Sequence, residues 1–219
     1  MRTPYMVKSR RGMLRRSFIV VLVLAACGVA ACQEKDTHEE EIAHLASLLN
    51  WKPGSVVAEV GAGDGRMTLA TAQRVGPAGR VYTTELDPKK LAHLEEVAAK
   101  AKNITTIRAG ATETNLPEGC CESVFMRLVY HHLTKPAKID ASLFRSLRPG
   151  GLLAVIDEYP TGAPLPKGVP KNRGGHGIPE KLLVQELTSA GFLVVTEIDP
   201  WAEWPVHHSY CVVFRRPEP

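Results

Sequence analysis

A glycine-rich turn that directly follows a short apolar segment is the feature that most constrains the fold of this chain. Residues 56–60 (VVAEV) form the apolar segment, and residues 61–65 (GAGDG) follow without a spacer. Glycine adopts a positive φ without a side-chain clash and lets a ligand approach the backbone closely. A buried strand that ends in such a turn and leads into a helix is a common ligand-binding element of α/β domains. The sequence therefore predicts a ligand site at the carboxyl end of this strand.

The rest of the chain alternates between helical and strand patterns. After an amphipathic helix that contains Ile42 and Leu49, we expect helices at about residues 67–75, 88–102, 136–147 and 179–190. We expect strands at residues 56–60, 80–85, 104–109, 123–127, 152–157, 192–198 and 209–215. This order predicts an α/β fold: a doubly wound, mostly parallel seven-stranded sheet with an antiparallel C-terminal hairpin and helices on both faces.

Length and charge indicate one domain behind a basic leader. The 219 residues suffice for one α/β domain, and we divide them into a leader at 1–26, a tether at 27–40 and a domain at 41–219. The net charge of +4 is misleading, because residues 1–26 hold six basic residues and no acidic one. The remaining body has 21 basic and 23 acidic residues, so the charge does not support nucleic-acid binding.

The leader has the pattern of a bacterial export signal. Arg15 and Arg16 precede an apolar run at 18–26, which is too short for a bilayer that needs about 20 residues. Residues 24–27 (LAAC) resemble a lipoprotein lipobox, in which Cys27 is lipidated and becomes the mature N-terminus. Residues 15–19 (RRSFI) resemble a twin-arginine signal, which exports folded proteins. We therefore expect an exported, periplasmic or membrane-anchored lipoprotein.

Other interpretations of this leader remain open. It could be an uncleaved anchor, or a misassigned start upstream of a cytoplasmic protein. Cys32, in residues 29–32 (VAAC), ends a weaker second lipobox.

The acidic residues around the glycine turn narrow the class of ligand. The turn reads GxGxG and is followed by Arg66, so the third glycine of the dinucleotide pattern GxGxxG is missing. Glu59 lies inside the apolar strand. A carboxylate there is better suited to bind the amino group of a methionine moiety than to bind a dinucleotide. Glu85 ends the next strand, where a carboxylate can accept hydrogen bonds from ribose hydroxyls.

Three motifs resemble those of class I S-adenosylmethionine (SAM)-dependent methyltransferases: residues 59–65, 85–88 (ELDP) and 147–151 (LRPGG). Their spacing agrees over about residues 41–215. The resemblance implies a methyltransferase (EC 2.1.1.-) with SAM as cofactor and S-adenosyl-L-homocysteine (SAH) as product. The cofactor-binding residues that it implies are Glu59, Gly61, Ala62, Gly63, Gly65, Glu85, Leu86, Thr112 and Arg127.

The chain departs from that family after the third strand. The family often has Gly-Asp-Ala there, with the aspartate at the adenine amine, whereas residues 110–112 are Gly-Ala-Thr. Thr112 or Glu113 could replace the missing carboxylate.

Residues 131–133 (HHL), after the fourth strand, resemble small-molecule methyltransferases of the ubiquinone/menaquinone-biosynthesis type. We therefore expect a small-molecule acceptor and no nucleic acid. Methyl transfer needs an aligned acceptor and, where the acceptor is protonated, a base. The candidate catalytic residues are His131, Tyr130 and Asp157.

Each candidate also has a structural interpretation. His131 is a base or packs beside the cofactor, Tyr130 lines the cleft or fills it, and Asp157 binds an acceptor or ends a solvated loop. For His132 we favour helix capping or packing over catalysis. Residues 160–179 are either a lid that carries His176 or a loose surface loop.

The cysteines of the body are Cys120, Cys121 and Cys211. Because neighbouring cysteines rarely bridge each other, we expect buried or incidental thiols. A disulfide from Cys120 or Cys121 to Cys211 stays open. We expect no metal site.

Three rival functions remain open. Residues 49–54 and 75–81 also resemble protein-L-isoaspartate O-methyltransferases. The domain could instead be a non-catalytic SAM- or SAH-binding module tethered to a membrane, or a nicotinamide-dependent oxidoreductase.

Overall fold

The computed structural model describes residues 39–201 and 208–218. The leader, Cys27, Cys32 and most of the tether lie outside the described residues. Residues 39 and 40, which we assigned to the tether, already belong to a helix over residues 39–48. Within the described ranges, no helix has both the length and the apolar character needed to span a bilayer.

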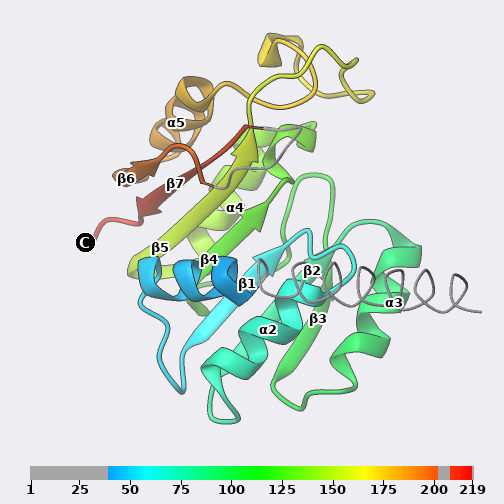
Figure 1. Cartoon of the computed structure of the whole chain (residues 1–219), viewed down its shortest axis with the longest axis vertical. Coiled ribbons are helices and arrows are strands. Elements are labelled where there is room, and N and C mark those ends of the chain that lie inside the picture. The colour runs from blue at the N-terminus through cyan, green and yellow to red at the C-terminus, as the bar shows by residue number, and fades with distance from the viewer. Residues whose placement is uncertain (1–38, 202–207, 219) are drawn as a thin grey trace, which may run out of the picture. The chain divides into compact units, whose positions relative to one another are not determined.

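A seven-stranded sheet forms the centre of the domain, in the order β3-β2-β1-β4-β5-β7-β6 (Figure 1). Its strands are β1 (Val56–Val60), β2 (Arg80–Glu85), β3 (Ile104–Arg108), β4 (Cys121–Arg127), β5 (Leu147–Glu158), β6 (Leu193–Ile198) and β7 (Ser209–Arg215). β1 to β5 are parallel, and β7 runs antiparallel to both β5 and β6. The predicted fold class is confirmed, with the last strand inserted between β5 and the edge strand β6.

Helices cover both faces of this sheet. They are α2 (Arg66–Val75), α3 (Pro88–Ala98), α4 (Pro136–Ser146) and α5 (Glu180–Ser189), with short 3-10 turns η1 (Tyr130–His132) and η2 (Lys171–Arg173). Successive strand residues point to opposite faces. Val57 accordingly packs in the core with α2 and the 39–48 helix, whereas Ala58 packs in the core with α4 and α5. Figure 1 shows α2 in front of the strands and α4 behind them.

The strand order reverses direction between β1 and β4. β1 is followed outward by β2 and β3, and β4 by β5, so the connections diverge from this pair. Ligands of doubly wound sheets bind outside the carboxyl ends of the strands at such a point. The glycine turn that follows β1 lies there.

The predicted turn at residues 148–151 is an irregularity within β5. Leu147 already pairs with Cys121, and regular pairing resumes at Leu152 opposite Ser123. Gly150, with φ 76°, lies in the interrupted stretch. Our prediction that β5 begins at Leu152 was therefore wrong: the chain bulges out of the ladder and returns to it instead of entering from a loop.

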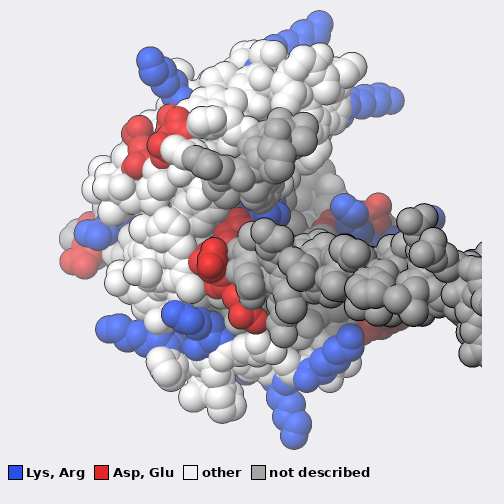
Figure 2. Space-filling view, viewed as in Figure 1, with Lys and Arg blue, Asp and Glu red and all other residues white. Residues whose placement is uncertain are grey.

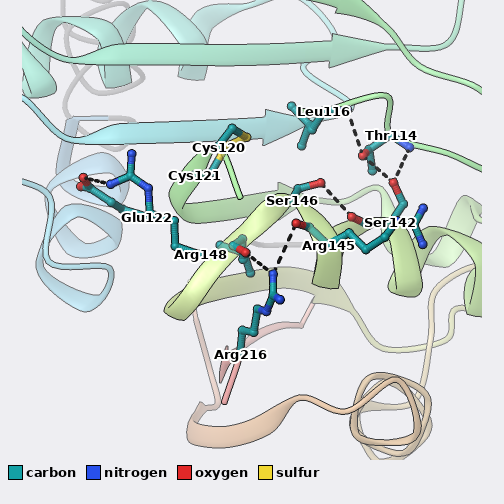
Figure 3. The surroundings of a disulfide bond; sticks show 11 residues. Thr114, Leu116, Cys120, Cys121, Glu122, Ser142, Arg145, Ser146, Arg148 and Arg216 are labelled. Atoms are coloured by element: carbon teal, nitrogen blue, oxygen red, sulfur yellow. Dashed lines mark hydrogen bonds and ion pairs between the residues drawn. A yellow bond between two sulfur atoms is a disulfide. The ribbon is translucent and has the colours of Figure 1, made fainter. Parts of the chain in front are cut away.

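A disulfide joins Cys120 to Cys121 at the start of β4 (Figure 3). Cys211 is buried and is not part of this disulfide. The expectation of incidental thiols was therefore wrong for the neighbouring pair.

Candidate active site

A cavity of about 530 Å³ opens at the carboxyl ends of β1, β2 and β4. Its wall also includes the segment that follows β3, residues 128–129 and residues 132–134. The volume falls within the range of about 300–1,000 Å³ that is typical of small-molecule sites. The cavity therefore occupies the place that the strand order predicts for a ligand.

The glycine turn forms one side of this cavity. Gly61 has φ 77°, and a Cβ atom there would lie 2.6 Å from a methyl carbon of Val129, so both conformation and space exclude a side chain. The main-chain amides of Gly61 and Ala62 each donate to the carbonyl oxygen of Thr84 at 3.0 Å. These bonds hold the turn against the end of β2.

Glu85 lies at the centre of this wall. Its carboxylate, 8% exposed, accepts from the amides of Gly63 (3.0 Å), Leu86 (2.8 Å) and Asp87 (3.0 Å). A carboxylate offers about four acceptor positions, so three backbone donors fix its orientation and leave capacity for a ligand. Leu86 is 54% exposed on the cavity wall, which places an apolar surface beside the carboxylate.

The structure brings together five of the nine predicted cofactor residues on the cavity wall. They are Gly61, Gly63, Glu85, Leu86 and Arg127. The other four do not line it: Glu59, Ala62, Gly65 and Thr112. Gly65 takes φ 75° at the start of α2, which completes the turn.

Glu59 is buried behind the glycine turn. Its side chain is held by the hydroxyl of Thr68 on α2. Burial, opposed chiefly by that hydrogen bond, raises the pKa of Glu59 to about 8. This carboxyl group therefore links β1 to α2 within the fold.

The segment after β3 was the uncertain part of the predicted site. Of the two residues considered as replacements for the missing aspartate, Glu113 lines the cavity and Thr112 does not. Glu113 also accepts from the Arg145 guanidinium at 2.8 Å. Glu113 is thus the acidic residue of this segment that lines the cavity.

His131 and Asp157 form a buried pair, and neither residue lines the cavity. Nδ1 of His131 lies 2.6 Å from Oδ1 of Asp157, and the His131 amide donates to Oδ2 at 3.1 Å. Asp157 is fully buried and His131 is 2% exposed. Because Nδ1 contacts Asp157, Nε2 is the remaining ring nitrogen for proton transfer or ligand binding. Nε2 has no hydrogen-bond partner.

Tyr130 points away from the cavity. Its hydroxyl group donates to Asp140 and Glu186, both at 3.0 Å, and its side chain is fully buried. The guanidinium of Arg173 lies 5.6 Å from its ring centroid. Tyr130 therefore fills the core beneath the site, the second of the two alternatives drawn from the sequence.

His132 and His176 lie beside His131. His132 lines the cavity. It does not cap α4, whose N-cap is Lys135. Burial, followed by the charges of His131 and His176, lowers the pKa of His132. The ring of His176 lies 4.5 Å from that of His131 and 5.1 Å from that of His132.

Residues 160–179 are anchored to the domain and do not form a loose loop. Arg173 and Ile178 are fully buried, and Val169 is nearly so. The sequence offered His176 only as one residue of a long connection. Its meeting with the histidines of η1 depends on how this segment folds back.

Residues 58–155 match a family model described as a methyltransferase domain. A ubiquinone/menaquinone biosynthesis C-methyltransferase from Marinomonas is 24% identical over 117 residues, which cover 52% of this chain and 47% of that protein. A protein-L-isoaspartate O-methyltransferase from Aeropyrum pernix is 28% identical over 128 residues, which cover 56% and 45%. The chain thus matches about half the length of these curated relatives.

A solved structure has the same fold. A SAM-dependent methyltransferase from Aquifex aeolicus superposes with a TM-score of 0.65 at 23% identity, covering 80% of this chain and 88% of that one. The fold is therefore the Rossmann-like fold of class I SAM-dependent methyltransferases.

Proposed function

We propose that this chain, whose residues 58–155 match a family model described as a methyltransferase domain, transfers a methyl group from SAM to a small-molecule acceptor. The observation that carries the proposal is the pairing of Glu85 with the glycine turn on one cavity wall. The Glu85 carboxylate is held by backbone donors and lies next to an exposed apolar residue. This combination fits a nucleoside: a carboxylate for the ribose hydroxyls and an apolar surface for the base.

Different residues on the cavity wall would bind different parts of SAM. Glu85 would accept hydrogen bonds from the ribose hydroxyls, Leu86 would pack against the adenine, and the turn at 61–63 would allow close approach of the methionine part. When bound, SAM supplies an electrophilic methyl group on a sulfonium. The protein then has to align the acceptor and manage its proton.

His131 is the acceptor-side group. Asp157 orients the His131 ring through Nδ1, so Nε2, which is buried in this structure, is the nitrogen that would take the proton of an acceptor. On the face shown in Figure 2, the described Lys and Arg residues are dispersed among acidic ones and form no single basic patch. This distribution supports a small acceptor over a nucleic acid.

Calorimetry with the Glu85→Gln variant tests the proposal. Hydrogen bonds to charged groups contribute about 1.5–3 kcal/mol, so the Kd for SAM should rise about 10- to 150-fold. The matched control is Glu96→Gln, at an 80% exposed side chain on α3, which should leave the Kd unchanged. The proposal fails if Glu85→Gln binds SAM normally, or if the unaltered protein binds NAD but not SAM.

A second candidate is carboxyl methylation of isoaspartyl peptides, which the similarity to the Aeropyrum pernix protein favours. Labelled SAM offered with an isoaspartyl peptide and, separately, with a small-molecule extract separates the two candidates. Label in the peptide alone would replace the first proposal by the second. SAM binding with label in neither would favour the non-catalytic binding module.

A further inference from the structure

Three histidines from two separate segments meet beside the cavity. His131 and His132 belong to η1, and His176 belongs to the segment between β5 and α5. Each offers a ring nitrogen, and these atoms all lie within 4.8 Å of one another. Imidazoles gathered in this way are ligands suited to zinc, copper, iron or nickel ions.

Two carboxylates contact the Nδ1 atoms of His131 and His176. Asp157 lies 2.6 Å from Nδ1 of His131, and Glu158 lies 3.0 Å from Nδ1 of His176. Metal-binding histidines almost always donate their second ring N–H to such a partner, which fixes the tautomer and leaves the other nitrogen for the metal. Here both contacts leave Nε2 as that nitrogen.

The Nε2 atom of His131 is the independent sign of a missing ligand. The side chain is 2% exposed, and this atom has no hydrogen-bond partner. A buried polar atom without a partner costs about 1–3 kcal/mol. A cation at this position would accept the lone pair and remove that cost.

We propose that His131, His132 and His176 bind a divalent transition-metal ion of the Zn²⁺ type, with one coordination position open. Three histidines with an open fourth position are typical of catalytic zinc sites. Imidazole nitrogens about 2.0–2.1 Å from a tetrahedral ion lie about 3.4 Å apart, so small side-chain rotations close the site. The sequence led us to expect no metal, because the three histidines come together only in the fold.

The place of the ion indicates its role, which rests on the proposed methyl transfer. His132 lies on the cavity wall, so the open position lies next to the space for the acceptor. The ion would bind an acceptor through an oxygen or sulfur donor and lower the pKa of that group. His131 then acts as a ligand, and the charge of the ion replaces its role as a base.

Metal analysis after equilibrium dialysis tests the site. The full chain, stripped with a chelator and dialysed against Zn²⁺, should retain one ion per chain. His176→Ala should weaken binding by more than about 100-fold, since even loss of a supporting carboxylate costs about 10- to 100-fold. The control is His93→Ala on α3, outside the cluster, which should retain the ion. Circular dichroism and urea unfolding of His176→Ala, measured without metal, show whether this variant is folded.

Two further measurements identify the ligands. Glu158→Gln should weaken Zn²⁺ binding about 10- to 100-fold without changing the stoichiometry. Co²⁺ in place of Zn²⁺ should give visible bands of a nitrogen-ligated ion without thiolate charge-transfer bands. Absence of binding, thiolate bands, or full retention by His176→Ala would each overturn the site. Because these readouts need no SAM, they leave the test of methyl transfer separate.

Discussion

Glu59 is a buried carboxyl group whose ionisation the fold opposes. Its pKa is raised from 4.5 to about 8, mainly by burial. The folded protein therefore holds a proton on Glu59 that the unfolded chain releases between these values. Stability from this group is fully present below pH 4.5 and is lost as pH rises toward about 8, with a slope of at most about 1.4 kcal/mol per pH unit.

We predict that Glu59→Gln removes this part of the pH dependence. Glutamine cannot ionise and still accepts a hydrogen bond from Thr68, so the variant should gain stability relative to the unaltered protein as pH rises from 5.5 to 8. Urea unfolding at both pH values measures the difference. An identical pH slope in the two proteins would show that Glu59 ionises normally in the fold.

At the residue scale, motifs predicted the backbone and strand-end positions better than side-chain directions. Gly61 and Glu85 follow from their places at the ends of β1 and β2, where the fold sets both position and chemistry. Tyr130 could not be oriented, because a short 3-10 turn has no periodicity that assigns a face. Thr112 was misplaced relative to Glu113 because the irregular segment after β3 has no pattern to fix alternation.

At the scale of elements, one buried cation holds the segment at 160–179 in place. Arg173 in η2 is fully buried, donates to Glu186 at 2.8 Å and covers the ring of Tyr130. Burial raises the pKa of the neighbouring Asp140 to about 7, and the charge of Arg173 opposes that rise. Arg173 therefore joins the segment to α5 through the Glu186 carboxylate.

We predict that Arg173→Met destabilises the protein by about 3 kcal/mol, because it leaves Glu186 without its cation. The matched control is Lys171→Met, an exposed residue of the same turn, which should stay within about 0.5 kcal/mol. Chemical unfolding gives these values, and limited proteolysis should show faster cleavage at 160–179 in Arg173→Met alone. Equal stability of the two variants would mean that the segment is held by apolar contacts alone.

Element order was predictable because hydrophobic periodicity and glycine or proline breaks recur along the chain. The start of β5 was not, since a bulge and a turn share the same Pro-Gly-Gly pattern and only pairing with β4 distinguishes them. The histidine cluster was equally hidden. It forms when η1 and the 160–179 segment meet, and nothing local to either sequence records that contact.

At the scale of the whole molecule, Ile42–Pro219 forms one compact unit. The leader and Cys27 precede it in the chain and lie outside the described residues. If residues 15–19 act as a twin-arginine signal, they would export the domain already folded. From the lipobox-like residues 24–27, we propose a lipid anchor at Cys27.

We predict that Cys27→Ser moves the full chain, expressed in a bacterial host, from the membrane to the aqueous fraction. Each buried CH₂ of an acyl chain contributes about 0.8 kcal/mol to membrane binding, so loss of the lipidated cysteine removes the anchor. Cys32→Ser is the matched control and should remain with the membrane. Detergent partitioning and the mass of the N-terminal peptide measure both variants. If only Cys32→Ser is released from the membrane, the anchor is at Cys32 in the second lipobox. If the unaltered chain is found unlipidated in the aqueous fraction, lipidation is ruled out. That result would favour a cytoplasmic protein or one released after export.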